Sequence, residues 1–187
     1  MREPNDDALI ALVHRLGVSN RPPFHPHDAH AVDVELRALV ARLELQCELL
    51  SQCEFDHYGS GYASFVDAWF YRADQTFGTS TRGLQKCAGL CVIFCRHAPC
   101  FALLEGTKTW GEKAASSYLP SLDAVDQFAT DAVRTLAGEI TNVLADMGFT
   151  RLARAQLGSK LEDVFHIQTN LSDPPFSTFD ALFQWMD

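Results

Sequence analysis

Apolar residues recur at steps of three and four positions in three parts of the chain, the spacing of one face of an α-helix. The pattern predicts helices over residues 6–17, 28–53 and 121–148, and a further short helix over residues 150–157. The apolar faces of the three main helices are Leu9, Leu12, Val13 and Leu16; then Val32, Leu36, Leu39, Leu43, Cys47 and Leu50; then Val125, Phe128, Ala132, Leu136, Ile140, Val143 and Met147.

Capping residues fix the expected ends of these helices. Asp6 or Asp7, Asp28 and Ser121 precede the three apolar patterns, and short polar side chains accept hydrogen bonds from the first backbone N–H groups of a helix. Gly17 and Gly148 follow the first and third patterns, where glycine commonly ends a helix.

Dense aromatic and β-branched residues predict strands elsewhere. Residues 62–72 read as a strand with Phe65, Asp67, Trp69 and Tyr71 on one side. Residues 89–95 and 101–105 read as a hairpin whose turn is 96–100. Two further strands are expected at 164–169 and 178–186, a polar loop at 74–83 and an irregular segment at 107–120.

Hairpin-connected strands beside two long helices predict an α+β fold. We expect one domain over residues 1–187, with a largely antiparallel sheet packed against the two long helices. Residues 1–27 form a short helix and a Pro-rich connector within that domain, because three prolines in five positions prevent a regular helix. The sequence contains no repeat and no linker long enough to divide it.

Composition narrows the function classes. The 24 acidic and 15 basic residues give a net charge of −9, which repels phosphate backbones and argues against nucleic-acid binding. We expect a cytoplasmic location, because the N-terminus lacks an apolar signal region and the apolar stretches are too short to span a membrane. In that reducing compartment the six cysteines are expected to be free thiols in the core.

Metal and cofactor sites are not expected. Cys87, Cys91, Cys95 and Cys100 lack the Cys-x2-Cys pairs of structural zinc sites, and two of them on one strand face lie too far apart to share an ion. The residues 25–30, with three histidines, could hold a metal, but a solvated connector is the preferred interpretation.

Catalytic motifs are also missing from the sequence. Residues 78–83 have the outer spacing of a phosphate-binding loop, but Leu84 and Gln85 replace its Lys and Ser/Thr. Cys100, in the predicted turn beside His97, is the one thiol expected to be partly exposed. It is therefore the nucleophile of an alternative hypothesis, a small thiol-dependent enzyme.

Three stretches carry a resemblance to a known family. They are residues 56–65 (Asp-His-Tyr-Gly-Ser-Gly-Tyr-Ala-Ser-Phe), residues 116–120 (Ser-Ser-Tyr-Leu-Pro), and residues 171–175 (Leu-Ser-Asp-Pro-Pro) with 179–185 (Phe-Asp-Ala-Leu-Phe-Gln-Trp). Together they resemble small cytoplasmic immunity proteins encoded beside bacterial polymorphic toxins of the type VI secretion and Rhs kind. The resemblance spans roughly the last two-thirds of the chain.

The resemblance implies a protein that binds and blocks one cognate toxin and has no catalytic residues of its own. Many such proteins end in Trp-Glu-Asp, where this chain ends in Trp185-Met186-Asp187. A third hypothesis is a non-catalytic assembly subunit, and the oligomeric state is left open. For a toxin interface we expect exposed acids and loop aromatics: Asp56, Tyr58, Trp110, Tyr118, Asp123 and Asp126. Trp110 and Tyr118 could equally close the ends of the sheet.

Overall fold

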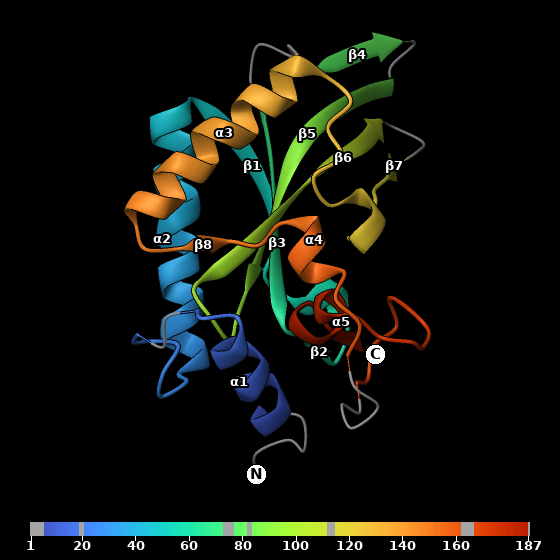
Figure 1. The fold of residues 1–187 in the computed structure, drawn as a ribbon. Helices are drawn as coiled ribbons and strands as arrows, with labels where there is room; N and C mark the ends of the chain where they lie inside the picture. Colours follow the sequence, from blue (N-terminus) through green and yellow to red (C-terminus); the bar gives the residue numbers. More distant parts are fainter. Residues whose placement is uncertain are drawn as a thin grey trace.

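A twisted sheet runs through the centre of the molecule, and helices lie on both of its faces (Figure 1). The computed structural model describes residues 6–18, 21–72, 77–81, 84–111, 115–161 and 167–186. Within these ranges seven strands form the sheet: β1 (Leu49–Glu54), β3 (Phe65–Arg72), β4 (Gly78–Thr81), β5 (Leu84–Cys95), β6 (Cys100–Gly111), β7 (Ala115–Ser116) and β8 (Thr150–Arg151). A separate two-stranded sheet joins β2 (Tyr62–Ala63) to β9 (Trp185–Met186).

The sheet is antiparallel except at one pair. The strand order is β1-β3-β5-β6-β7, with β4 beside β5 and β8 parallel to β6. The β5–β6 hairpin is the longest pairing, from Leu84 opposite Gly111 to Phe94 opposite Phe101. The α+β fold with a largely antiparallel sheet is thus confirmed. The helices are α1 (Asp6–Arg15), α2 (Ala29–Cys47), α3 (Asp131–Asp146), α4 (Arg154–Leu157) and α5 (Thr178–Leu182), with short 3-10 turns η1 (His57–Gly59) and η2 (Leu122–Ala124).

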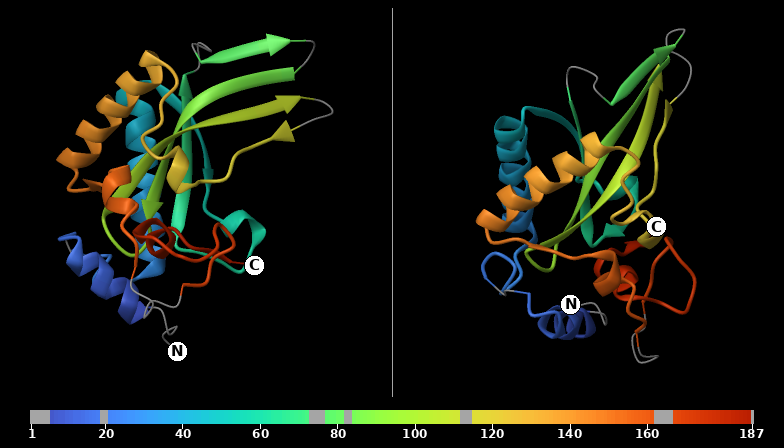
Figure 2. Two further views of the ribbon diagram at one scale, coloured as in Figure 1. Left: turned by 45° about the vertical axis from the view of Figure 1, so that its right-hand side comes forward. Right: turned by 45° about the horizontal axis from the view of Figure 1, so that its top comes forward.

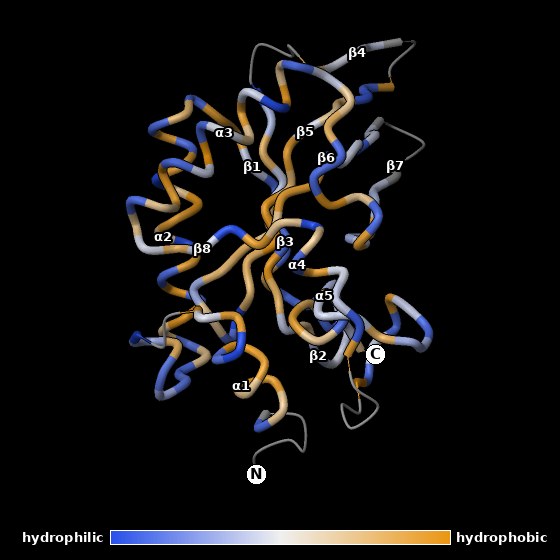
Figure 3. The backbone as a smooth tube through the Cα atoms, viewed as in Figure 1, coloured by the Kyte–Doolittle hydropathy of each residue, from blue (hydrophilic) through white to orange (hydrophobic). Residues whose placement is uncertain are grey.

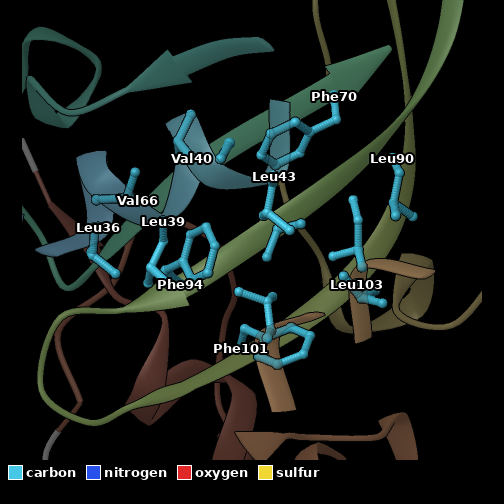
Figure 4. Close-up of a cluster of buried hydrophobic side chains, with 14 of the residues drawn as sticks. Leu36, Leu39, Val40, Leu43, Val66, Phe70, Leu90, Phe94, Phe101 and Leu103 are labelled. Carbon is cyan, nitrogen blue, oxygen red and sulfur yellow. The ribbon is translucent and has the colours of Figure 1, made fainter. Parts of the chain in front are cut away.

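Helices α2 and α3 cover one face of the sheet over a cluster of buried apolar residues. Asp28 caps α2 as expected, because its Oδ1 accepts a hydrogen bond from the Ala31 N–H at 3.0 Å. The expected apolar face of α2 is buried against the sheet as far as Cys47. Figure 4 shows the labelled side chains of this core: Leu36, Leu39, Val40 and Leu43 from α2, and Val66, Phe70, Leu90, Phe94, Phe101 and Leu103 from the strands.

The opposite face is covered only in part, by the short helices α1, α4 and α5 (Figure 2). Hydrophobic residues concentrate along the central strands where helices lie over them (Figure 3). The far ends of β4, β5, β6 and β7 extend beyond the helices, so this end of the sheet carries an open face (Figures 1 and 2). No helix in the described part of the chain is both long enough and apolar enough to cross a membrane.

Two helix boundaries differ from the sequence prediction. The second helix ends at Cys47 because Glu48 adopts a left-handed conformation (φ 54°), and β1 follows in place of a last helical turn. The third helix begins after Thr130, whose hydroxyl accepts a hydrogen bond from the Val133 N–H. Val125, expected on that helix, instead forms a β-bridge with Leu104.

The C-terminal strand prediction is wrong for residues 178–182, which form α5. Asp180 accepts hydrogen bonds from the backbone N–H and the hydroxyl of Ser177, and this pair starts the helix. Only Trp185 and Met186 are extended, in β9. Of the expected strand at 164–169, residues 164–166 lie outside the described ranges and residues 167–169 are not a strand.

Three smaller elements also differ. The expected loop at 74–83 contains β4. The segment 107–120, predicted to be irregular, begins in strand β6, which continues to Gly111. The short helix expected over 150–157 is reduced to α4, preceded by β8. Extended pairing with β5 and β6 accounts for all of these additional strands, because neighbouring strands satisfy their backbone groups.

Candidate functional site

A buried carboxylate lies on the partly covered face of the sheet. Asp67 of β3 is only 4% exposed, and three donors from different segments surround it. The Tyr58 hydroxyl donates to its Oδ2 at 2.7 Å, and the Tyr118 hydroxyl and the Cys91 thiol donate to its Oδ1, each at 3.0 Å. We call these four residues the Asp67 cluster. These three hydrogen bonds satisfy a polar side chain that is removed from water.

The electrostatics of the Asp67 cluster hold its donors in the protonated state. Burial, reinforced by the nearby carboxylate, raises the pKa of Tyr58 and of Tyr118 and raises that of the Cys91 thiol well above its usual range. Protonated hydroxyls and a protonated thiol donate hydrogen bonds but are poor bases and nucleophiles. The cluster is therefore suited to holding segments together and unsuited to acid–base or nucleophilic chemistry.

A glycine makes room for one of these donors. A Cβ atom at Gly106 would lie 2.2–2.5 Å from carbons of the Tyr118 ring, so the ring packs directly against the β6 backbone. The Trp69 indole N–H donates to the Gly106 carbonyl at 2.9 Å. The Lys108 ammonium lies 5.1 Å from the Trp69 ring centroid and 5.9 Å from that of Tyr118, within cation–π range.

The structure brings three distant parts of the chain together around the Asp67 cluster. Tyr58 comes from η1 and Tyr118 from the segment before η2. Trp185 of β9 packs its ring edge-on to Tyr58, with centroids 5.9 Å apart, and its indole N–H donates to the His57 carbonyl at 3.1 Å. The resemblance segments at residues 56–65, 116–120 and 179–185 therefore each contribute one aromatic residue, Tyr58, Tyr118 and Trp185, to this neighbourhood.

A pocket of about 270 Å³ lies on the open end of the same sheet face. Leu50 of β1, Tyr71 of β3 and Trp110 of β6 provide its apolar walls. The Tyr71 ring stacks on buried Trp69 at 4.8 Å, and the Trp110 ring lies edge-on to Trp69 at 6.2 Å, so the walls rest on the core. The remaining lining residues are Gln52, Gly78, Thr79, Gln85, Lys86 and Cys87.

The six residues expected at a partner interface lie in different environments. Asp56 is exposed, and Trp110 is half-buried in the pocket wall. Tyr58 and Tyr118 point inward to Asp67 and close the core, which was the second interpretation given to Tyr118.

The last two of these residues, Asp123 and Asp126, are already paired with arginines. Asp126 accepts from the Arg151 guanidinium at 2.6 Å and from the Arg154 backbone N–H at 2.9 Å. Asp123 accepts from the Arg154 guanidinium at 2.7 Å. These contacts fasten η2 to β8 and α4.

The expected exposure of Cys100 is wrong, because its side chain is completely buried. A hydrogen bond to the neighbouring Cys95 thiol, together with burial, raises the pKa of Cys100 well above the usual range. All six cysteines are free, and five are buried. The thiol-dependent enzyme hypothesis thus loses the nucleophile on which it relied.

In the histidine-rich connector, His27 contacts the side chain of His97, where the sequence had suggested a metal site as one interpretation. The His27 ring lies against that of His97 at a centroid distance of 5.0 Å, and His97 Nε2 is 2.8 Å from the Tyr62 hydroxyl. Buried Arg96 lies 3.1 Å from Asp33 as an ion pair that is not aligned as a hydrogen bond, and it donates to the Phe55 carbonyl. Among the residues that the structure describes, no three His, Cys, Asp or Glu side chains could hold one metal ion.

Sequence reasoning missed most of the pocket. Leu50 was assigned to a helix, and Gln85 was considered only as a departure from a phosphate-binding loop. The alternation that places Tyr71 beside Trp69 was the one available signal. No protein-family model, curated protein or solved structure matches the chain.

Proposed function

We propose that this chain is a cytoplasmic immunity protein that binds a secreted bacterial toxin and blocks its active site. The observation that carries the proposal is the pocket formed by Leu50, Tyr71 and Trp110, which offers apolar walls and side-chain amides. Its one thiol, Cys87, is buried, and burial raises its pKa above the usual value. The pocket therefore offers groups that can bind part of a partner, and its thiol is not activated.

The size and the composition of the pocket favour a protein side chain as the occupant. Its volume of about 270 Å³ lies below the range of about 300–1,000 Å³ that is usual for small-molecule sites. Interface anchors are commonly large side chains inserted between aromatic residues, and polar groups at the rim fix their orientation. Gln52, Gln85 and Lys86 are exposed at this position and can pair with backbone carbonyl or acidic groups beside the anchor.

Two further features support the proposal. The segments that resemble toxin-immunity proteins contribute Tyr58, Tyr118 and Trp185 to the surroundings of Asp67, so these residues have a structural role and the pocket at the open end of the sheet is left to contact a partner. The net charge of −9 favours encounter with a basic toxin, because complementary fields raise the association rate.

The test has two stages, capture and protection. The tagged chain is used to isolate partners from its native cells, and the toxic domain of a captured partner is then expressed in a sensitive host with and without this chain. We expect one partner and restored growth. Absence of both a partner and protection would overturn the proposal.

A matched pair of variants tests the pocket. Leu50→Glu places a charge in the pocket wall and should weaken toxin binding by more than tenfold and abolish protection. Leu45→Glu is the same change on exposed α2, beyond the other face of the sheet, and should leave binding and protection unchanged. Equal binding by both variants would show that the toxin docks elsewhere.

A further inference from the structure

Helix α2 has a second apolar face in addition to the one packed on the sheet. Val34 and Leu45 are 54% and 81% exposed, and Ala38 and Ala41 between them are also exposed. These four residues are spaced by four, three and four positions, the spacing of the contact positions in a coiled coil. We call them the outer seam.

The outer seam lies directly opposite the core. At about 100° per residue, its members fall roughly 180° around the helix from Leu36 and Leu43, which are fully buried against the sheet. Figure 1 shows α2 as part of the outer layer of the molecule, with its length along the sheet. A surface helix normally has a polar outer face, so an apolar seam there is a surface on which a partner can pack.

The charges beside the outer seam identify that partner. Glu35 and Arg42 lie along one flank, and Arg37 and Glu44 along the other. If a second α2 packs antiparallel about a two-fold axis, Val34 meets Leu45 of the second copy and Ala38 meets Ala41. In the same arrangement each flank meets its own equivalent, so Glu35 faces Arg42 and Arg37 faces Glu44.

We propose that two copies of this chain form an antiparallel dimer through the outer seams of α2. The same flanks disfavour a parallel pair, because that arrangement would place Arg37 of one copy beside Arg42 of the other. They also disfavour a membrane surface, since the flanks carry two acids and two bases and lack the excess of basic residues that anionic lipids attract.

The flanking side chains are already held close to their positions. The Arg37 guanidinium lies 3.8 Å from the centroid of the Phe55 ring, and the Glu44 carboxylate accepts from the Ser51 hydroxyl at 2.8 Å. Glu35 accepts from the Arg21 guanidinium at 2.7 Å and remains partly exposed. Partial ordering reduces the side-chain entropy that the dimer must lose.

The seam limits the strength of the dimer. From Val34 to Leu45 it extends about 16 Å along the helix, so two seams bury less than the roughly 1,600 Å² of a standard interface. A reversible dimer with a dissociation constant on the order of micromolar is expected. Sedimentation velocity of the full chain over a range of concentrations should show this equilibrium, and a monomer at every concentration would overturn the proposal.

Charge reversal tests the pairing. Arg42→Glu places the new glutamate of each copy opposite Glu35 of the other copy. Glu35→Arg places the new arginine of each copy opposite Arg42 of the other copy. Because like charges then face each other, each variant alone should dimerise at least tenfold more weakly. An equal mixture of the two variants restores opposite charges at both contacts and should recover the dimer. Unchanged dimerisation of the single variants, or no recovery on mixing folded variants, would refute the antiparallel seam. Circular dichroism establishes that each variant is folded.

The dimer and the toxin site are separable. Leu45→Glu should abolish dimerisation and retain protection against the toxin, whereas Leu50→Glu should retain the dimer and lose protection. A dimer that persists in Leu45→Glu would overturn the outer seam whatever the outcome of the toxin experiment. The dimer thus stands or falls independently of the proposed function.

Discussion

The two faces of the central sheet are stabilised in different ways. The face under α2 and α3 is closed by two long helices over a large cluster of buried apolar residues. The opposite face is closed by short helices and irregular segments, and it contains buried polar residues such as Ser64, Asp67 and Gln184. A long helix brings a continuous apolar stripe, whereas short segments need side-chain hydrogen bonds to satisfy their ends and to fix their positions.

The largest expected difference between the faces comes from removing the Asp67 carboxylate. Asp67→Leu leaves the hydroxyls of Tyr58 and Tyr118 and the thiol of Cys91 buried without their acceptor, and we expect a loss of about 3–5 kcal/mol in the free energy of unfolding. Leu103→Met changes the apolar face at nearly constant volume and should cost less than about 1.5 kcal/mol. Urea denaturation of both variants measures the contrast.

A triple variant sharpens this result. Adding Tyr58→Phe and Tyr118→Phe to Asp67→Leu removes two of the unsatisfied donors, so at least about half of the lost stability should return. If the triple variant is no more stable than Asp67→Leu, the loss arises from packing and the hydrogen bonds contribute little. Denaturation under the same conditions distinguishes these outcomes.

Two glycine-to-alanine substitutions should change the stability of the protein in opposite directions. Gly106→Ala drives a methyl group into the Tyr118 ring and should destabilise the protein by about 2–3 kcal/mol. Gly138 lies on the exposed side of α3, with open space where its Cβ would be. Gly138→Ala should therefore stabilise the protein by about 0.5–1 kcal/mol. Thermal unfolding of both variants provides the measurement, and equal signs would show that the ring of Tyr118 moves aside readily.

The same contrast explains which parts of the fold the sequence could predict. The buried face of α2 follows directly from its periodicity, because a long helix repeats its pattern several times. The start of α3 was misplaced because Val125 and Phe128 fit the helical spacing, although Val125 forms a β-bridge with Leu104 of β6. Residues 179–185 alternate like a strand over too short a length to exclude a helix, and Ser177 with Asp180 was the missed signal.

The candidate site was harder to predict for a related reason. Asp67 was visible as an acid within an apolar strand, but its partners Tyr58 and Tyr118 are 9 and 51 residues away. Nothing local in the sequence indicates which distant hydroxyl will reach a buried carboxylate. Trp110 was noted, yet its pocket depends on the pairing of β1 with β3, and that part of the chain was predicted to be helical.

Lowering the pH should reduce the stability of the folded protein through His97, which lies against His27. Burial, with the charges of His27 and Arg96 nearby, lowers the pKa of His97 to about 4 from its usual value of 6.5. Between these values the unfolded chain binds a proton that the folded chain excludes, so stability is retained above pH 6.5 and falls as the pH decreases towards 4. The His97 contribution to this loss is about 1–2 kcal/mol at pH 5.

His97→Gln provides the check. Glutamine can still hydrogen-bond to the Tyr62 hydroxyl but does not titrate, so the difference in urea stability between pH 7 and pH 5 should be smaller than in the unaltered chain. An identical pH difference in the two proteins would show that other groups cause the acid sensitivity.

The smallest effect concerns the true start of α3. The Thr130 hydroxyl caps this helix by accepting from the Val133 N–H at 3.2 Å, so Thr130→Ala should destabilise by about 1 kcal/mol. Ser121, the cap expected from sequence, makes no side-chain capping hydrogen bond to η2, and Ser121→Ala should change stability by less than about 0.5 kcal/mol. Comparing the two denaturation midpoints decides between the starts, since a larger effect at Ser121 would mean that the helix begins nine residues earlier in solution.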